Sequence, residues 1–195
     1  MIETTSTHAL VCCFRLLPLS CGAEIDQSYS AQFYGLTPLR DYPGRMVEVG
    51  RFCVDPAYRD PDILRLAWAA LTRFVDAEEI EMLFGCSSFQ GTETAQYLDA
   101  FAMLKEHHLA PERWQPRVKA PDVFRFARRL RRKADPKAAA RAMPPLLRSY
   151  LAMGGLGQRS RGGGPGSGHA PCLHRARGPH HPSYARTSLA GSGLT

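Results

Sequence analysis

Apolar side chains fill three short runs of the chain without the spacing of a helix. In residues 8–17 nearly every position is apolar, so an extended segment would have two apolar faces, as strands inside a sheet do. Pro18 follows and is expected to end that strand. Residues 46–54 are rich in β-branched and aromatic side chains and stop at Asp55, and a third run covers residues 80–86. The pattern predicts three strands.

Apolar positions recur at helical spacing after the second and third strands. The first such stretch, residues 63–75, follows Asp60-Pro61, which supply a candidate N-cap and a proline at the first helical position. The second stretch, residues 97–108, precedes Pro111. Residues 28–44 have weak periodicity and are expected to form a loop with a short helix. The order strand–helix–strand–helix indicates an α/β (or α+β) fold with a mixed central sheet flanked by helices.

A further amphipathic helix is predicted where Val123, Phe126, Ala127 and Leu130 line one apolar stripe. The opposite side of this helix is basic and contains no acidic residue. Its members are Arg125, Arg128, Arg129, Arg131, Arg132 and Lys133. Such a face is either simply solvated or binds an anionic membrane surface or an acidic protein, with binding to nucleic-acid phosphates a weaker third alternative.

Composition restricts the class of protein. The chain has 195 residues, of which 44% are hydrophobic, enough for one domain with a real core. No run reaches the roughly 18–20 continuous apolar residues of a membrane-spanning helix, and the N-terminus lacks a signal-peptide pattern, so a cytoplasmic protein is expected. The cysteines show no CxxC spacing, which favours reduced, buried thiols and no metal site. The six cysteines are Cys12, Cys13, Cys21, Cys53, Cys86 and Cys172.

The net charge of +7 is concentrated at the end of the chain. Residues 157–195 contain five arginines, no acidic residue and nine of the 17 glycines, and they show no apolar periodicity. We therefore expect this tail to be disordered. Tyr184 is its only aromatic residue, so the stacking sites that nucleic-acid-binding arms need are absent, and no nucleic-acid partner is predicted.

Two charged residues interrupt the otherwise apolar second strand. Burial of Glu48 or Arg51 is costly unless each charge is paired or faces a cleft. Strict alternation would place them on opposite faces, but a bulge at Gly50 could bring both toward one cleft. Glu48 could then take a proton from an amine and Arg51 could hold a carboxylate, a combination suited to amino-acid substrates. The alternative is an edge strand with solvated charges.

Other candidate residues lie at strand ends. The turn before residue 63 could bind an anion at the helix N-terminus through Arg59, but Asp60 and Asp62 place negative charge there. Ser87 and Ser88 follow the third strand and either bind substrate or satisfy turn backbone groups. No GxSxG, P-loop or Rossmann fingerprint is present.

Four fragments, in order, resemble one family. Residues 46–59, 83–88, 107–112 and 144–151 are similar to the L-ornithine N-alpha-acyltransferases of bacterial ornithine-lipid synthesis. The resemblance implies a GNAT-type acyltransferase fold, related to the acyl-homoserine lactone synthases. It also implies transfer of a 3-hydroxyacyl group from acyl carrier protein to the α-amine of L-ornithine, giving lyso-ornithine lipid, with no cofactor besides this acyl donor.

The resemblance also suggests roles for the candidate residues. Glu48 is expected to be catalytic, and Arg51, Ser87 and Ser88 to bind the substrate. The expected acyl-donor-binding residues, which would contact the carrier protein or hold the enzyme at the inner membrane face, are Arg59, Arg125, Arg128, Arg129 and Arg132. Alternatives are an acyl-homoserine lactone synthase-like enzyme or a non-enzymatic basic adaptor at anionic membranes or nucleic acid.

The chain departs from the family at both ends. Residues 1–156 are expected to form a partial GNAT-type domain, because relatives carry a further strand and helices ahead of the segment that matches Ala9. After Met153 the family continues with a pattern of strand character that this chain lacks, and a change of reading frame would account for the tail at 157–195. Low stability and low or no activity are therefore expected.

Overall fold

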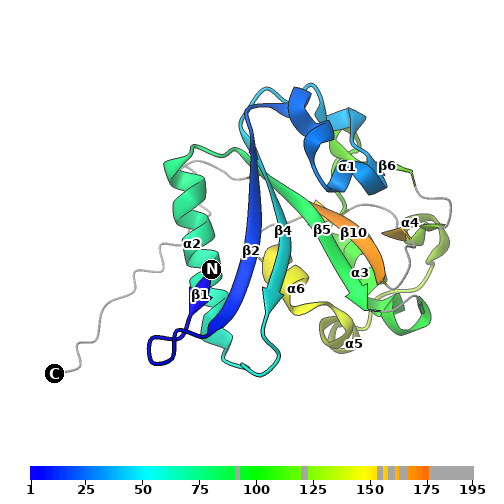
Figure 1. Cartoon of the computed structure of the whole chain (residues 1–195). Helices are drawn as coiled ribbons and strands as arrows, with labels where there is room; N and C mark the ends of the chain where they lie inside the picture. Colours follow the sequence, from blue (N-terminus) through cyan, green and yellow to red (C-terminus); the bar gives the residue numbers. More distant parts are fainter. Residues whose placement is uncertain (91–92, 120–122, 153–155, 158–160, 163–166, 176–195) are drawn as a thin grey trace.

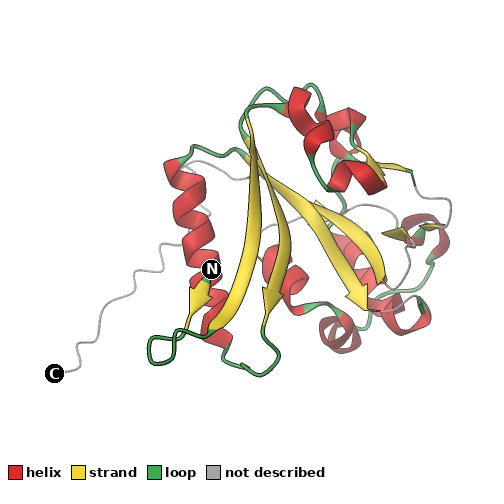
Figure 2. Ribbon diagram, in the orientation of Figure 1, coloured by secondary structure: helices red, strands yellow, loops and turns green. Residues whose placement is uncertain are grey.

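The fold is built on one mixed β-sheet with helices on both faces (Figures 1 and 2). A computed structural model describes residues 1–90, 93–119, 123–152, 156–157, 161–162 and 167–175. The strand order is β1-β2-β4-β5-β10-β9-β7, with β8 on β10, and β4 and β5 form its parallel pair. Its strands are β1 (Ile2–Glu3), β2 (Leu10–Leu19), β4 (Met46–Val54), β5 (Met82–Gln90), β7 (Val123–Phe124), β8 (Leu156–Gly157), β9 (Arg161–Gly162) and β10 (Ser167–Arg175). The mixed α/β sheet predicted from the sequence is confirmed.

Helices and a small second sheet complete the described chain. A two-stranded sheet pairs β3 (Tyr34–Gly35) with β6 (Arg117–Val118). The α-helices are α1 (Ser30–Phe33), α2 (Pro61–Ala77), α3 (Leu98–His107), α4 (Phe126–Arg129), α5 (Pro136–Ala142) and α6 (Pro145–Ala152). The 3-10 helices are η1 (Gly22–Gln27), η2 (Thr37–Leu39), η3 (Ala95–Tyr97) and η4 (Glu112–Trp114).

The two faces of the central strands bury different elements. On one face, Val47 and Leu83 pack under Leu71 and Val75 of α2. On the other face, Met46 and Phe84 of the alternate positions pack with residues of η1, η2 and the segment before β4. Figure 1 shows α2 along one side of the sheet and the α1 segment over the upper end of β4 and β5. Burial on both sides explains why these strands read as nearly continuous apolar runs.

Helix α2 begins where the sequence predicts it to begin. The Asp60 side chain accepts a hydrogen bond of 2.8 Å from the Asp62 N–H, and Pro61 occupies the first turn. This cap satisfies a backbone donor that has no partner within the helix. The predicted second helix is also confirmed, as α3, and the loop with a short helix predicted over residues 28–44 is confirmed by α1 and η2.

Strand boundaries differ from prediction at two places. β2 continues through Pro18, which is paired with Val47, and ends at Leu19. On the edge of β2 that faces away from β4, the short strand β1 pairs only with Leu10 and Cys12. No described strand pairs with that edge beside Pro18, so a proline without an N–H is tolerated there. β5 continues past Cys86 to Gln90 because β10 pairs along its full length.

The predicted basic helix is much shorter than its pattern suggests. Phe126 and Leu130 are buried, as the apolar stripe requires, but α4 ends at Arg129 and Leu130 is already extended. A run of like charges three and four residues apart disfavours a helix, which explains the early end. Arg132 instead leaves the helix and forms an ion pair of 2.5 Å with Asp99 of α3.

The expectation of disorder over residues 157–195 needs correction for the part that the structure describes. Residues 167–175 form strand β10, which pairs antiparallel with the whole of β5. A ladder is made by backbone groups, so the outer edge of β5 can recruit a segment that has no apolar pattern. Residues 158–160, 163–166 and 176–195 lie outside the described residues, and for them the prediction stays untested.

Two further observations concern the described residues alone. None of their helices has the length and apolar character needed to cross a bilayer. The five cysteines whose side chains are described carry free thiols, and of these Cys12 is buried whereas Cys53 is exposed. The prediction of buried thiols is therefore confirmed for Cys12 and wrong for Cys53.

Candidate active site

The two parallel strands of the sheet separate soon after they meet. Residues 46–48 of β4 pair with residues 82–84 of β5, and beyond this point the described strands run on to Val54 and Gln90 without pairing to each other. A Cβ atom on Gly85 would lie 2.3 Å from the carbonyl oxygen of Val49, so the strands still touch at the first position after the ladder. We call this junction, residues 46–54 and 82–90, the β4–β5 fork. Within the fork, β4 and β5 are paired with each other only at residues 46–48 and 82–84.

A bulge lies in β4 just beyond the start of the fork. Cys13 of β2 is paired with Cys53, but Arg15 is paired with Gly50, so β4 contains one residue more than β2 over this stretch. Arg51 has φ 54, a conformation that a non-glycine side chain rarely adopts. The bulge predicted at Gly50 is confirmed, with its left-handed residue at Arg51.

The bulge changes which side chains of β4 face α2. Before it, Val47 and Val49 contact the α2 side, whereas after it Phe52 and Val54 do so. Glu48 and Arg51 therefore both lie on the opposite face, the one covered by α1. The prediction that a bulge brings these two residues to the same side of the sheet is confirmed.

Glu48 is a buried carboxylate that accepts three hydrogen bonds. Its side chain is 2% exposed. Oε2 accepts a hydrogen bond from the Tyr29 N–H at 2.8 Å, and Oε1 accepts one from the Ser30 N–H at 2.7 Å and one from the Ser30 hydroxyl at 2.5 Å. These bonds compensate for the loss of water around the charge. They also fix the start of α1 against β4.

The Ser30 hydroxyl also reaches β5. Its oxygen lies 3.3 Å from Cys86 Sγ, and burial raises the pKa of the Cys86 thiol to about 11. The Ser30 hydroxyl has one proton, which is donated to Glu48, so in this arrangement the thiol of Cys86 is the donor to Ser30. Cys86, Ser30 and Glu48 thus form one hydrogen-bonded chain from β5 to β4.

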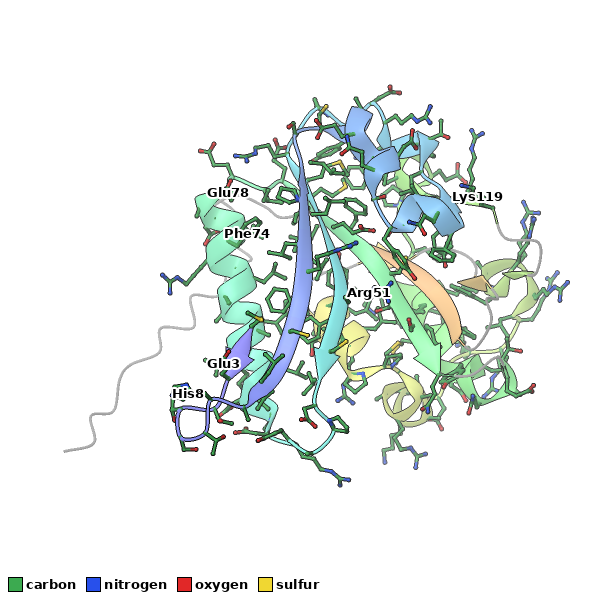
Figure 3. The ribbon with its side chains drawn as sticks, in the orientation of Figure 1. Glu3, His8, Arg51, Phe74, Glu78 and Lys119 are labelled. Atoms are coloured by element: carbon green, nitrogen blue, oxygen red, sulfur yellow. The ribbon has the colours of Figure 1, made fainter. Side chains whose placement is uncertain are left out.

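Arg51 lies beside this chain on the exposed part of the same face. Its guanidinium carbon is 5.1 Å from the centre of the Tyr29 ring, whose backbone N–H donates to Glu48 (Figure 3 labels Arg51). Among the described residues no carboxylate pairs with Arg51. A guanidinium stacked on a ring by its face keeps its N–H edge available for a bidentate carboxylate.

The other predicted site residues are more dispersed. Ser87 and the exposed Ser88 lie on the β5 arm of the fork and point to opposite faces of the sheet. Arg59 is exposed in the loop before α2. Arg125, Arg128 and Arg129 are exposed at α4, on the other side of the molecule in Figure 1, whereas Arg132 is engaged with Asp99. The five predicted donor-binding arginines therefore do not form one surface.

Sequence reasoning did not identify four residues of this region. Tyr29, Ser30 and Cys86 carry no local signal, because their role depends on contacts between segments far apart in the chain. Arg15 of β2 is exposed and lies on the same face of the sheet as Glu48 and Arg51 of β4. A charge inside an apolar strand was the signal for Glu48, and the same signal was present at Arg15.

Among the described residues no group of three or more His, Cys, Asp or Glu side chains is arranged to hold a metal ion. The side chains described above offer a buried carboxylate linked to a hydroxyl and a thiol, with an exposed guanidinium on the same face of the sheet.

Comparisons with known proteins agree with the resemblance seen in the fragments. Residues 1–69 match the acetyltransferase (GNAT) domain family. The chain is 41% identical over 147 residues to the L-ornithine N(alpha)-acyltransferase of Rhodobacter capsulatus, which covers 75% of this chain and 56% of the relative. It is 28% identical over 158 residues to the enzyme of the same name from Rhizobium meliloti, covering 80% of this chain and 53% of the relative.

A third relative, the L-ornithine N(alpha)-acyltransferase of Brucella abortus, is 30% identical over 131 residues, covering 66% of this chain and 46% of its own length. The chain thus spans about half the length of the curated relatives that it matches. No solved structure matches the chain.

Proposed function

We propose that this chain, a homologue of the L-ornithine N(alpha)-acyltransferases with a GNAT-type fold, carries the transfer centre of an N-acyltransferase that acylates the α-amine of L-ornithine. The observation that supports this most is the β4–β5 fork, where Glu48 and Arg51 lie on one face because of the bulge. A buried proton acceptor next to an exposed guanidinium matches the needs of an amino acid that must present a neutral amine.

The acceptor is held by charge. In the proposed complex, Arg51 forms a bidentate pair with the α-carboxylate of ornithine, and the α-amine then lies on the Glu48 side of the bulge. The amine must lose a proton before it attacks the acyl carbon, and Glu48 is the nearest carboxylate along β4 that can take it. Ser88, an exposed residue on the β5 arm, is proposed to contact the substrate from the other strand.

The donor is a thioester that enters the fork. The β4–β5 ladder ends at Glu48 and Phe84, and in the proposed complex backbone N–H groups just beyond that point, at residues 49–51 and 85–87, stabilise the oxyanion that forms at the acyl carbon. The reaction forms a C–N bond, breaks the C–S bond and releases the carrier thiol, so it needs no cofactor beyond the acyl donor.

The donor is proposed to be a 3-hydroxyacyl group on acyl carrier protein, and the product lyso-ornithine lipid. The N-terminus of α2 supports a protein-bound donor over free coenzyme A, because Asp60 already occupies the Asp62 N–H and places negative charge where a pyrophosphate would bind. Arg59 and the exposed arginines of α4 are available to an acidic carrier protein or to an anionic membrane surface.

The test is an acylation assay with the purified full chain. L-Ornithine, L-lysine and S-adenosylmethionine are offered as acceptors, each with 3-hydroxyacyl-acyl carrier protein and with acyl-coenzyme A, and products are identified by mass spectrometry. Formation of Nα-acylornithine from the carrier-bound donor is expected, in place of the low or absent activity expected from the sequence, because strand β10 pairs along β5 where a disordered tail was expected. A homoserine lactone product from S-adenosylmethionine would replace the proposal by the activity of the related lactone synthases, and no product with any pair would overturn it.

A further inference from the structure

Glu48 is too deeply buried to touch a substrate in the described structure. Its side chain is 2% exposed, and its two oxygens already accept bonds from Tyr29 and Ser30. Ser30 is itself 1% exposed. If Glu48 takes the proton of the amine, the proton needs a path from the surface of the site to the carboxylate.

Described residues of α1 and β5 supply a hydrogen-bonded path to Glu48. The Ser30 hydroxyl, which is both donor and acceptor, links Glu48 Oε1 at 2.5 Å to Cys86 Sγ at 3.3 Å. Cys86 is only partly buried and lies on β5 two residues after the last pair of the parallel ladder. It is therefore the least buried member of the path.

We propose that Cys86 and Ser30 relay the proton of the substrate amine to Glu48, an inference that rests on the proposed function. The ammonium gives a proton to Cys86 Sγ, the original thiol proton moves to Ser30 Oγ, and the hydroxyl proton of Ser30 moves to Glu48 Oε1. The step leaves a neutral amine, a neutral thiol, a neutral hydroxyl and a protonated Glu48, so charge and protons balance. Collapse of the acyl adduct returns one proton to the departing thiolate.

The state of Cys86 suits this role better than that of a nucleophile. Burial raises the pKa of the thiol to about 11, so at neutral pH Cys86 is a protonated thiol that can donate a hydrogen bond to Ser30. A covalent acyl-cysteine would need the thiolate instead. In the relay Cys86 touches the substrate and is a catalytic residue, whereas Ser30 acts through its neighbours and is a positioning residue.

Several other titratable or charged groups surround the relay. They belong to the described residues that pack around α1, β4 and β5, and they are Tyr29, Tyr34, Tyr42, Arg51 and Lys119. The Tyr42 hydroxyl donates to Glu81 Oε2, and the Lys119 ammonium donates to the Ala31 carbonyl (Figure 3 labels Lys119). Arg51 lies over the Tyr29 ring, and in the proposed complex it binds the substrate carboxylate.

The decisive variants remove one link without removing the backbone bonds of Glu48. Ser30→Ala loses the hydroxyl but keeps the Ser30 N–H, whereas Ser30→Thr keeps both. Ser28→Ala is the matched control, because Ser28 is an equally buried serine of the same segment whose hydroxyl bonds the Ile25 carbonyl and the Ala31 N–H instead of Glu48. Cys86→Ala and Cys86→Ser make the corresponding pair on β5.

The readout is kcat/KM for ornithine as a function of pH, with the full chain. Ser30→Ala and Cys86→Ala are expected to lose roughly 100-fold at pH 7, the usual contribution of a positioned proton acceptor. The loss should shrink as pH rises toward the pKa of the α-ammonium group of ornithine, because a growing fraction of the amine is then already neutral. Ser30→Thr and Cys86→Ser should restore most of the rate, and Ser28→Ala should show the pH profile of the unchanged protein.

The outcomes separate the relay from the function on which it rests. An active protein whose Ser30→Ala variant loses the same factor at every pH, or loses no more than Ser28→Ala does, would overturn the relay and leave the acyltransferase proposal standing. A wild-type chain that acylates no amine would overturn the function and the relay together.

Discussion

Arg51 adopts a strained backbone conformation that determines where its side chain lies. A non-glycine residue at φ 54 costs roughly 1–2 kcal/mol relative to the right-handed region. The same conformation turns the guanidinium toward Tyr29 and onto the face of Glu48. Strain at a residue that the substrate is proposed to contact is what functional sites commonly show.

Arg51→Lys tests the bidentate contact. Lysine keeps the charge and the same backbone requirement but cannot form two parallel hydrogen bonds with a carboxylate, so KM for ornithine should rise roughly 10-fold or more while kcat changes little. Steady-state acylation kinetics measure both constants. Arg73→Lys, at an exposed position of α2, is the control and should behave like the unchanged protein. A wild-type KM in Arg51→Lys would remove Arg51 from the acceptor site.

Cys86 gives the protein a predictable response to alkaline pH. Its thiol pKa is about 11 in the fold against an ordinary value of 9.0, because burial disfavours the thiolate. Between these two pH values the unfolded chain releases a proton that the folded chain keeps. The contribution of the Cys86 thiol to the free energy of unfolding is therefore fully present below about pH 9 and is lost as pH rises toward about 11. The slope from this one group is at most about 1.4 kcal/mol per pH unit.

Urea unfolding from pH 8 to pH 11 measures this contribution. The free energy of unfolding of the wild type should fall toward that of Cys86→Ala as pH rises, because the variant has no thiol to ionise at this site. Parallel curves for the two proteins across the range would show that the Cys86 thiol ionises as easily in the fold as in the unfolded chain.

At the scale of elements, the junction of β4 and β5 depends on a missing side chain. A Cβ on Gly85 would sit 2.3 Å from the Val49 carbonyl oxygen, which is a backbone atom and cannot turn away. Where the strands must touch and then separate, glycine allows the close approach. The geometry of the fork is therefore set by Gly85 on one strand and by the bulge on the other.

Gly85→Ala should destabilise the protein by about 1–3 kcal/mol, the usual cost of forcing an extra methyl group into a packed site. Gly50→Ala is the matched control, because a Cβ there meets no atom within 4 Å. Urea midpoints of the two variants give the comparison. Equal stabilities would mean that β4 and β5 can move apart freely at Gly85.

Prediction from sequence succeeded where local patterns decide and failed where distant contacts do. Helix α2 follows from its apolar spacing and its Asp60 cap, and Gly50 marked the bulge. The bond of Ser30 to Glu48, 18 residues away, and the contact of Ser30 with Cys86, 56 residues away, leave no trace in either segment. The basic stretch after Phe126 misled because helical spacing of its apolar residues does not overcome repulsion among its arginines.

At the scale of the whole molecule, exposed arginines occur both in the fork, at Arg51, and away from it, at α4. Arg128 and Arg129 are exposed at α4, and neither forms an ion pair among the described residues. Arg132, the neighbour that does pair, ties this segment to Asp99 and so holds it against α3. A fixed basic edge of this kind suits docking of an acidic protein, because complementary charge speeds association.

Charge reversal at α4 tests carrier docking. The double variant Arg128→Glu, Arg129→Glu should raise KM for the acylated carrier protein several-fold, and the effect should weaken at high salt because surface charges are screened. Arg65→Glu, Arg73→Glu on α2 changes the net charge equally at another surface and is the control. If both double variants raise KM equally, net charge rather than an α4 docking surface is responsible.

The β4 bulge also makes Arg51 a residue that the fold can lose. With Arg51 deleted, Phe52 would follow Gly50, and strict alternation would leave Val49, Phe52 and Val54 on the α2 face, where they are now. Pairing with β2 would become regular, and the left-handed backbone conformation would disappear. The deletion variant should therefore unfold at an equal or higher urea concentration than the wild type while failing to bind ornithine. A lower urea midpoint in the deletion variant would show that the bulge contributes to packing. An equal or higher midpoint together with lost ornithine binding would show that the extra residue in β4 lowers or does not change stability and serves substrate binding.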